Sequence, residues 1–384
     1  MKKLQDKFQN AVAELQNNFI ERDELSIILV AGTLARFNTF LLGSAGVAKS
    51  QMIRYLGSMF SDAYVFDRPC HPTQSISDVV GPLKLSELQK GNDVYERKLT
   101  RYLAQADIAF LDEVGRSAGP VRDAILSIMN ERIYWNGDTL VDTPLQCLFS
   151  GSNHLLMDGR DDAFMDRFLY RYLVADQIKE EHNFKRLLRK PKFGKPSVQI
   201  SLSELKEAQG CVSSMGENYG EATEAALVAA RDALLDHGFS ASPRTWANIP
   251  TALAAFAYLE GDVELLPRHL EWLADAIWKK PEERNSVLFV VGNVSNPALA
   301  EAVRKLDRLK SEVSRIPEDV STPNWIGIVS KVNSTAKSVV RDLETAMLDP
   351  NANTPRMGEL LSEAQRLKKS VTSKCEAALG VKSV

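Results

Sequence analysis

The chain has 384 residues, enough for two or three domains at about 150 residues each. Its 44% hydrophobic and 25% charged residues are ordinary for a globular protein, and a net charge of −3 provides no overall attraction to nucleic acid or to anionic membranes. The four cysteines form no C-x-x-C pair and predict no zinc site. No stretch of 18 apolar residues and no signal-peptide core is present, so we expect a cytoplasmic protein.

The stretch 37–56 predicts a phosphate-binding loop between a strand and a helix. Residues 37–42 form an apolar run of the length of a buried strand, and apolar residues recur at helical spacing after position 51. Backbone N–H groups of such a loop, together with the helix N-terminus, direct positive charge at phosphates. The predicted nucleotide-binding residues are Gly43, Ser44, Ala45, Gly46, Val47, Ala48, Lys49, Ser50 and Gln51.

One position in this loop departs from the usual pattern. The pattern G-x-x-x-x-G-K-[ST] has glycine before lysine, whereas this chain has Ala48, and alanine tolerates a positive φ poorly. In a phosphate loop, Lys49 would reach the β- and γ-phosphates and the Ser50 hydroxyl would hold Mg²⁺. The alternative is a strand-to-helix turn with an incidental lysine.

Two later strands are expected to end in polar residues at the same sheet edge. The apolar run 108–111 is followed by Asp112 and Glu113, and the run 145–151 is followed closely by Asn153. At the ligand-binding edge of an α/β sheet, Asp112 can bind Mg²⁺, and Glu113 can polarise the attacking water. Asn153 can orient that water and sense the γ-phosphate. Surface turns are the alternative for all three residues.

Three arginines are candidates for stabilising the charge on the transferred phosphoryl group. Arg167 and Arg171 are four residues apart, so they would share one side of a helix if that stretch is helical. Either could reach a neighbouring subunit's site, or could pair structurally with Asp162 or Asp166. Arg244 follows a helix-start signal, Ser-Pro, and could face the nucleotide from a first helical turn; a surface arginine is the alternative.

Strands that alternate with helices over 37–175 predict a parallel sheet covered by helices. Gly-Asn-Asp at 91–93 and Asn-Gly-Asp at 136–138 predict inserted hairpins, the first with a short helix as its alternative. The basic stretch 179–197 predicts a linker or solvated edge rather than a nucleic-acid tail. The rest is helical in pattern. We therefore expect an α/β core with N-terminal helices at 1–178, a helical lid at 179–280 and a helical C-terminal domain at 281–384.

The order of these motifs resembles that of AAA+ ATPases. The stretches LLGSAGVAKS, SISDVVGPL, FLDEVGRSAGPVRDAILSIMNERIYWNG, SGSN and DAFMDRFLYRYLV are similar to the MoxR branch, and within it to the RavA-like group, whose loop shares the Ala-Lys variant. The resemblance covers roughly residues 25–260. It implies an α/β P-loop NTPase (AAA+) core with β-hairpin inserts, a helical lid and bound ATP and Mg²⁺.

The resemblance also implies roles for individual residues. Lys49, Ser50, Asp112 and Glu113 would serve phosphate, magnesium and water activation. It implies that Asn153 is the first sensor and that Arg244 is the second sensor. Arg167 would be the arginine finger that acts on the neighbouring subunit, and Arg171 is its competitor for that role.

Three functions are compatible with these features. The first is a hexameric, chaperone-like ATPase that remodels or assembles protein clients, with a von Willebrand A-domain partner implied by resemblance only. The second is an ATP-driven nucleic-acid motor, or a nucleotide-dependent subunit of a defence or phage system. Its support is the basic stretch 179–197 and the cations Lys84, Lys90, Arg97 and Lys98. The third is a scaffold that uses ATP as a structural switch. The presence of Glu113 argues against this function, because it favours ATP hydrolysis.

Overall fold

A computed structural model describes residues 2–85, 95–154, 162–189, 194–317, 319, 323–348 and 355–379. The chain forms two compact units. The first consists of Met1–Tyr219 and Ala241–Leu265, and the second of Gly220–Ser240 and Leu266–Val384. The predicted domain boundaries at 178 and 280 stay predictions.

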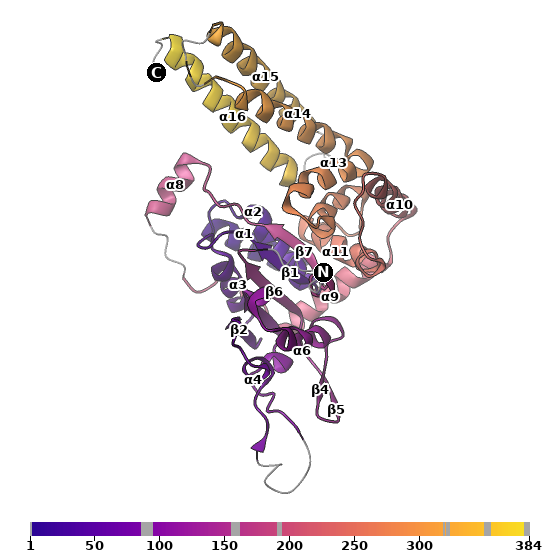
Figure 1. Ribbon diagram of the computed structural model, residues 1–384. Coiled ribbons are helices and arrows are strands. Elements are labelled where there is room, and N and C mark those ends of the chain that lie inside the picture. The colour runs from indigo at the N-terminus through magenta and orange to yellow at the C-terminus, as the bar shows by residue number, and fades with distance from the viewer. Residues whose placement is uncertain are drawn as a thin grey trace. The chain divides into compact units, whose positions relative to one another are not determined.

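The core of the first unit is a five-stranded parallel sheet with the strand order β2-β3-β6-β1-β7 (Figure 1). Every residue of β1 is buried between its two neighbours, as expected of an apolar run in a parallel sheet. The predicted parallel α/β fold is therefore confirmed. The strands are β1 (Asn38–Leu42), β2 (Val65–Pro69), β3 (Ile108–Asp112), β6 (Cys147–Ser152) and β7 (Phe168–Leu173).

Helices of the first part of this unit's sequence pack with the sheet. The N-terminal helices α1 (Lys2–Asn18) and α2 (Asp23–Leu34) contact α3 (Lys49–Ser58), and α2 also contacts β1 and β7. Further helical segments connect the strands. These are α4 (Ile76–Val80), η1 (Leu103–Gln105), η2 (Val114–Arg116), α6 (Gly119–Asn130) and α7 (Asp162–Met165).

The hairpin predicted around 136–138 is confirmed. Strands β4 (Ile133–Asn136) and β5 (Thr139–Asp142) pair in antiparallel register, and Gly137 takes a φ of +64° in the turn. In the other insert, Leu83 pairs with Arg97 in an antiparallel bridge, and the turn predicted at 91–93 lies outside the described residues. The Asn136 amide joins the two inserts, because it accepts from the Arg97 N–H at 2.6 Å and donates to the Arg97 carbonyl at 3.2 Å.

Three further helices belong to the first unit. The stretch predicted as a linker contains helix α8 (Glu181–Leu188), whose residues are all at least partly exposed. Helix α9 (Leu202–Glu217) begins with a capping box, in which Ser201 and Glu204 satisfy each other's backbone N–H groups. Helix α11 (Pro243–Glu260) packs on α9 and ends at Gly261, which has a φ of +94°.

The second unit is helical throughout its described part, which confirms the helical prediction for the C-terminal hundred residues. The charged side chain of Asp275 is buried and pairs with Arg284 and Arg356, and the Arg356 guanidinium lies over the Trp272 ring. The elements are α10 (Glu221–Asp236), η3 (Pro267–Leu273), α12 (Ala274–Ile277), η4 (Pro281–Glu283), α13 (Arg284–Ser295), α14 (Pro297–Ser314), α15 (Trp325–Ala346) and α16 (Pro355–Leu379). Within the described ranges, no helix of the chain has the length and apolarity needed to cross a membrane.

The contact between α9 and α11 predicts opposite effects for two glycines of α9. A Cβ at Gly216 would lie 2.6 Å from the Thr251 Cα, whereas a Cβ at Gly210 would meet no atom within 4 Å. We expect Gly216→Ala to destabilise the protein by about 1–3 kcal/mol through overpacking. Gly210→Ala should stabilise it by roughly 0.5–1 kcal/mol, because alanine favours a helix more than glycine does. Denaturant unfolding followed by circular dichroism measures both, and equal stability of the two variants would contradict this packing.

Candidate nucleotide-binding site

The candidate site lies where three neighbouring strands end. Leu42, the last residue of β1, is in register with Ser152 at the end of β6, and Asp112 at the end of β3 is in register with Gly151. Because parallel strands end at the same sheet edge, the loop that follows β1 lies beside the residues that follow β3 and β6. Ligands of open α/β sheets bind at this carboxyl edge.

The loop between β1 and α3 turns through two left-handed residues. Gly46 has a φ of +87°, and Ala48 has a φ of +71° immediately before the first residue of α3. A non-glycine residue in this conformation costs roughly 1–2 kcal/mol. Alanine also has no side-chain acceptor for the first N–H groups of α3, so these donors remain for an anion. The loop therefore keeps phosphate-cradle geometry at Ala48, at a cost in strain.

The Lys49 ammonium is buried among neutral acceptors. Its Nζ donates to the Gly43 carbonyl at 2.5 Å, to the Ser44 carbonyl at 2.9 Å and to the Asn153 Oδ1 at 3.2 Å. Burial lowers the pKa of Lys49, while the carboxylates of Glu113, Asp112 and Asp176 act in the opposite direction. Since none of its hydrogen-bond partners is an anion, Lys49 fits the role of a cation that binds phosphate.

Ser50 and Asp112 place two oxygen atoms together at the start of α3. The Ser50 hydroxyl donates to the Asp112 Oδ2 at 3.0 Å. A hydroxyl and a carboxylate are hard oxygen ligands of the kind that Mg²⁺ takes at phosphate sites, so the pair fits this ion. Gly151 leaves the space for this convergence, because a Cβ there would lie 3.2 Å from the Asp112 Oδ1 and 3.4 Å from the Lys49 Cε.

Glu113 is turned toward the end of β6. It has a φ of +55°, and its N–H donates to the Gly151 carbonyl at 2.7 Å. Its carboxylate accepts from the Ser152 hydroxyl at 3.0 Å and from the Asn153 N–H at 3.2 Å. The structure thus brings Glu113 and Asn153 into one hydrogen-bonded group with Lys49, and it adds Ser152, which the motif pattern did not single out.

Two further residues hold the phosphate loop and were missed by sequence reasoning. The Ser44 N–H donates to the Asp176 Oδ1 at 3.2 Å, and this contact lowers the pKa of Asp176. The Arg22 guanidinium is buried and donates from Nε to the Val47 carbonyl at 3.3 Å and from Nη2 to the Ala175 carbonyl at 2.9 Å. No local motif marks either residue, because their partners are distant in the sequence.

Only the start of the stretch that contains Arg167 and Arg171 is helical, so the two arginines do not share one side of a helix. Helix α7 ends at Met165, and Arg171 lies within β7, in register with Phe40. The aromatic-rich segment 168–173 favours a strand, and its first three residues are buried beside β1. Arg171 donates from Nη2 to the Met165 carbonyl at 3.3 Å, and Arg167 donates from Nη1 to the Ala163 carbonyl at 2.5 Å.

Arg167 and Arg244 lie away from the phosphate loop of their own chain. Arg167 precedes Phe168, which is in register with Asn38 at the start of β1, so Arg167 is at the opposite edge of the sheet from the loop. The Ser242 hydroxyl, at the start of α11, donates to the Asp166 Oδ2 at 3.3 Å, which brings Arg244 to this same edge. Arg244 is exposed. Both arginines are therefore at the amino edge of the sheet, whereas Lys49 is at the carboxyl edge.

The chain is similar to several known proteins. Residues 6–205 match the family described as the MoxR domain in the MoxR-vWA-beta-propeller ternary systems. Two uncharacterized proteins of Methanocaldococcus jannaschii, MJ0812 and MJ0079, are 31% and 34% identical to it, over 93% and 81% of this chain and 96% and 80% of theirs. A crystal structure of a candidate ATPase from Cytophaga hutchinsonii shares the fold, with a TM-score of 0.59 at 18% identity, over 79% of this chain and 94% of that one.

The family match covers more than half of the chain, and its span contains the phosphate loop, the acidic pair and Asn153. The solved structure independently supports the fold of this parallel sheet and its helices. The chain belongs to the MoxR family of AAA+ ATPases.

Proposed function

We propose that this chain binds ATP with Mg²⁺ in the cytoplasm, hydrolyses it, and works as a hexameric ring of identical subunits that remodels or assembles protein clients. The observation that carries the proposal is the division of charged groups between two sheet edges. Lys49, Ser50, Asp112 and Glu113 lie at the carboxyl edge, while Arg167 lies at the amino edge of the same sheet. A site that needs all of them is complete only between two copies.

The roles of the residues follow from their contacts. Lys49 and the first N–H groups of α3 would bind the phosphates, and Mg²⁺, held by Ser50 and Asp112, would neutralise charge on the phosphate oxygens. Glu113 would take up a proton from the attacking water, with its carboxylate held by Ser152 and Asn153.

Arginine from a neighbouring copy would complete the site. We favour Arg167 over Arg171 as the finger, because Arg167 precedes β7 whereas Arg171 lies inside the strand. Arg244 shares the edge with Arg167 and would act on the same neighbouring site. Both guanidinium groups would then stabilise charge that develops on the transferred phosphoryl group.

A partner is suggested by the family description, which names systems that combine MoxR, vWA and beta-propeller components. We therefore include a von Willebrand A-domain protein among the expected partners. The two joined inserts expose Tyr95 and Trp135, which are 65% and 60% exposed, and these aromatics are suited to contact a polypeptide client.

Two substitutions separate binding from hydrolysis. Glu113→Gln removes the proton acceptor but keeps the hydrogen-bonding shape, so we expect ATP binding with turnover reduced by about 10²–10⁴-fold. Lys49→Ala should lose ATP binding, because it removes the buried cation of the loop. Steady-state ATPase assays and equilibrium nucleotide binding measure both effects. Glu131→Gln, an exposed carboxylate outside the site, is the control and should behave as the parent. Unchanged turnover in Glu113→Gln would refute the assignment.

A mixing experiment tests whether the site is shared. Arg167→Ala and Glu113→Gln should each be inactive alone. In mixed rings, about one site in four receives an intact Glu113 from one copy and an intact Arg167 from the next, so ATPase activity should return. The same result is expected when Arg244→Ala replaces Arg167→Ala. Mixed rings that form yet stay inactive would argue against catalysis between copies.

A further inference from the structure

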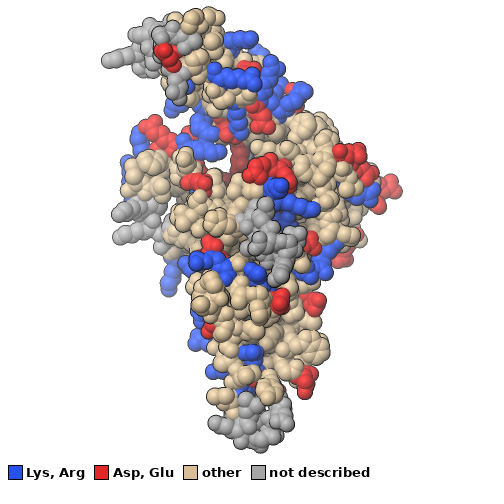
Figure 2. Space-filling model, viewed as in Figure 1, with Lys and Arg blue, Asp and Glu red and all other residues tan. Residues whose placement is uncertain are grey.

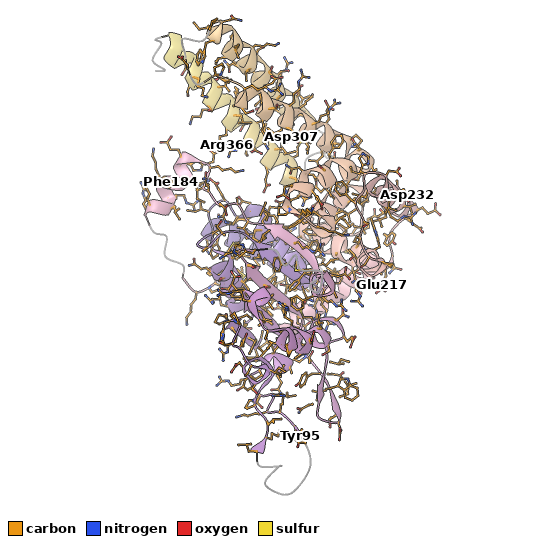
Figure 3. All side chains as sticks on the ribbon, viewed as in Figure 1. Tyr95, Phe184, Glu217, Asp232, Asp307 and Arg366 are labelled. Carbon is orange, nitrogen blue, oxygen red and sulfur yellow. The ribbon has the colours of Figure 1, made fainter. Side chains whose placement is uncertain are left out.

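Helix α8 presents an apolar face that no part of the described chain covers. Phe184, Leu187 and Leu188 lie on one face at spacings of three and four residues, and their exposed fractions are 49%, 44% and 65%. Figures 1 and 3 show α8, with Phe184 on it, standing off from the sheet of its unit. An exposed apolar face on a strongly amphipathic helix indicates a docking surface.

The other side of α8 is basic. Residues 181–189 contain three cations, Lys185, Arg186 and Arg189, against the single acid Glu181. Lys185 pairs with Glu181 at 2.6 Å, and Arg186 donates from Nη2 to the Asn17 carbonyl at 2.9 Å. The surface that surrounds the apolar face is therefore positively charged and would attract an acidic partner.

The base of α8 is bonded to the structure that holds the phosphate loop. The Glu21 carboxylate accepts from the N–H groups of Lys179 at 2.7 Å and Glu180 at 2.8 Å, immediately before the helix. A few residues earlier in the same segment, Asp176 accepts from the N–H of Ser44 in the loop. The segment that leads into α8 is therefore hydrogen-bonded to the candidate phosphate loop at its start and to Glu21 at its end.

A surface of complementary chemistry occurs on α10. The outward side of this helix exposes Val228 and Leu235, by 47% and 54% respectively. Helix α10 contains a single arginine, Arg231, which pairs with the neighbouring Asp232. Acidic side chains gather on α10 at the right of Figure 2. These acids are Glu221, Glu224, Asp232 and Asp236.

The opposite side of α10 packs inside the second unit. Its buried residues are small or apolar for the most part, and the helix contacts α13 and η3. The outward apolar residues therefore do not belong to this core. Among the described residues, Glu224 and Asp236 have no ion-pair partner, so their charges are available to a neighbouring molecule.

We propose that α8 of one copy docks on the outward face of α10 of the next copy in the ring. The proposal rests on the ring of the proposed function and names one of its contacts. Phe184, Leu187 and Leu188 would meet Val228 and Leu235, and the cations of α8 would meet the acids of α10. Burial of these apolar side chains would provide the affinity, and the opposite charges of α8 and α10 would select the partner surface.

The charges also determine the symmetry of the contact. Two α8 helices would repel each other, and so would two α10 helices, which disfavours a two-fold contact between identical surfaces. A contact between two different surfaces is head-to-tail and generates rings or helical assemblies. A lipid surface is a poorer match for α8, because an eight-residue helix with three apolar side chains buries little area.

Charge reversal tests the proposal in the Glu113→Gln background with ATP and Mg²⁺. One variant carries Lys185→Glu and Arg189→Glu on α8, and the other carries Glu224→Lys and Asp236→Lys on α10. Each alone should need at least about tenfold more protein to assemble, because like charges then face each other. An equimolar mixture should assemble as the parent does, since in rings where the two variants alternate every interface pairs either two native or two reversed surfaces. Analytical ultracentrifugation measures assembly.

The control variant carries Lys331→Glu and Lys337→Glu on α15, both exposed, and has the same change in net charge as the α8 variant. It should assemble as the parent does. Failure of the parent itself to assemble with ATP would overturn the ring of the proposed function. Normal assembly of both reversed variants would overturn only the docking.

Two other outcomes would also overturn the docking. If the mixture stays dissociated while one chain carrying all four reversals assembles, the contact forms within a copy. If the parent binds phosphatidylserine vesicles and the α8 variant loses that binding but still assembles, α8 serves a lipid surface instead.

Discussion

The arrangement of the site depends on one buried cation. A lysine ammonium loses much of its hydration when it is buried, and it remains stable only where other dipoles replace the water. Here the carbonyls of Gly43 and Ser44 and the amide oxygen of Asn153 do so. Two of these acceptors belong to the loop itself, and the third follows the end of β6. The loop, the end of β6 and the start of α3 are therefore held in one geometry by the need to satisfy Lys49.

The same requirement explains the unusual backbone around it. Ala48 and Glu113 both have positive φ values, which cost energy for residues with a Cβ. The first directs Lys49 and Ser50 into α3, and the second turns the Glu113 carboxylate toward Ser152 and Asn153. Strain at such positions persists where the surroundings overdetermine the conformation. Two strained residues next to one buried cation fit a site that is organised before its ligand binds.

Local pattern predicted the parts of this site that are contiguous in the sequence, and missed those that depend on distant partners. The strand, loop and helix at 37–56 could be predicted because the spacing of apolar residues and the positions of glycines are local properties of the sequence. Asp176 and Arg22 could not, because they support the loop from 132 and 25 residues away. The spacing of Arg167 and Arg171 gave them a shared side only if their stretch were helical, and pairing with β1 places Arg171 in a strand. The aromatic residues around Arg171 also favour a strand.

Asp176 gives the candidate nucleotide site a physical connection to the surface. Its carboxylate accepts from the loop at Ser44, and the backbone that follows is held by Glu21 up to the first residues of α8. A phosphate near the Ser44 N–H would compete for this donor and would repel the Asp176 carboxylate. Both effects would act on the segment that carries α8. For a ligand to act on α8 in this way, the segment would need two arrangements that the ligand favours unequally.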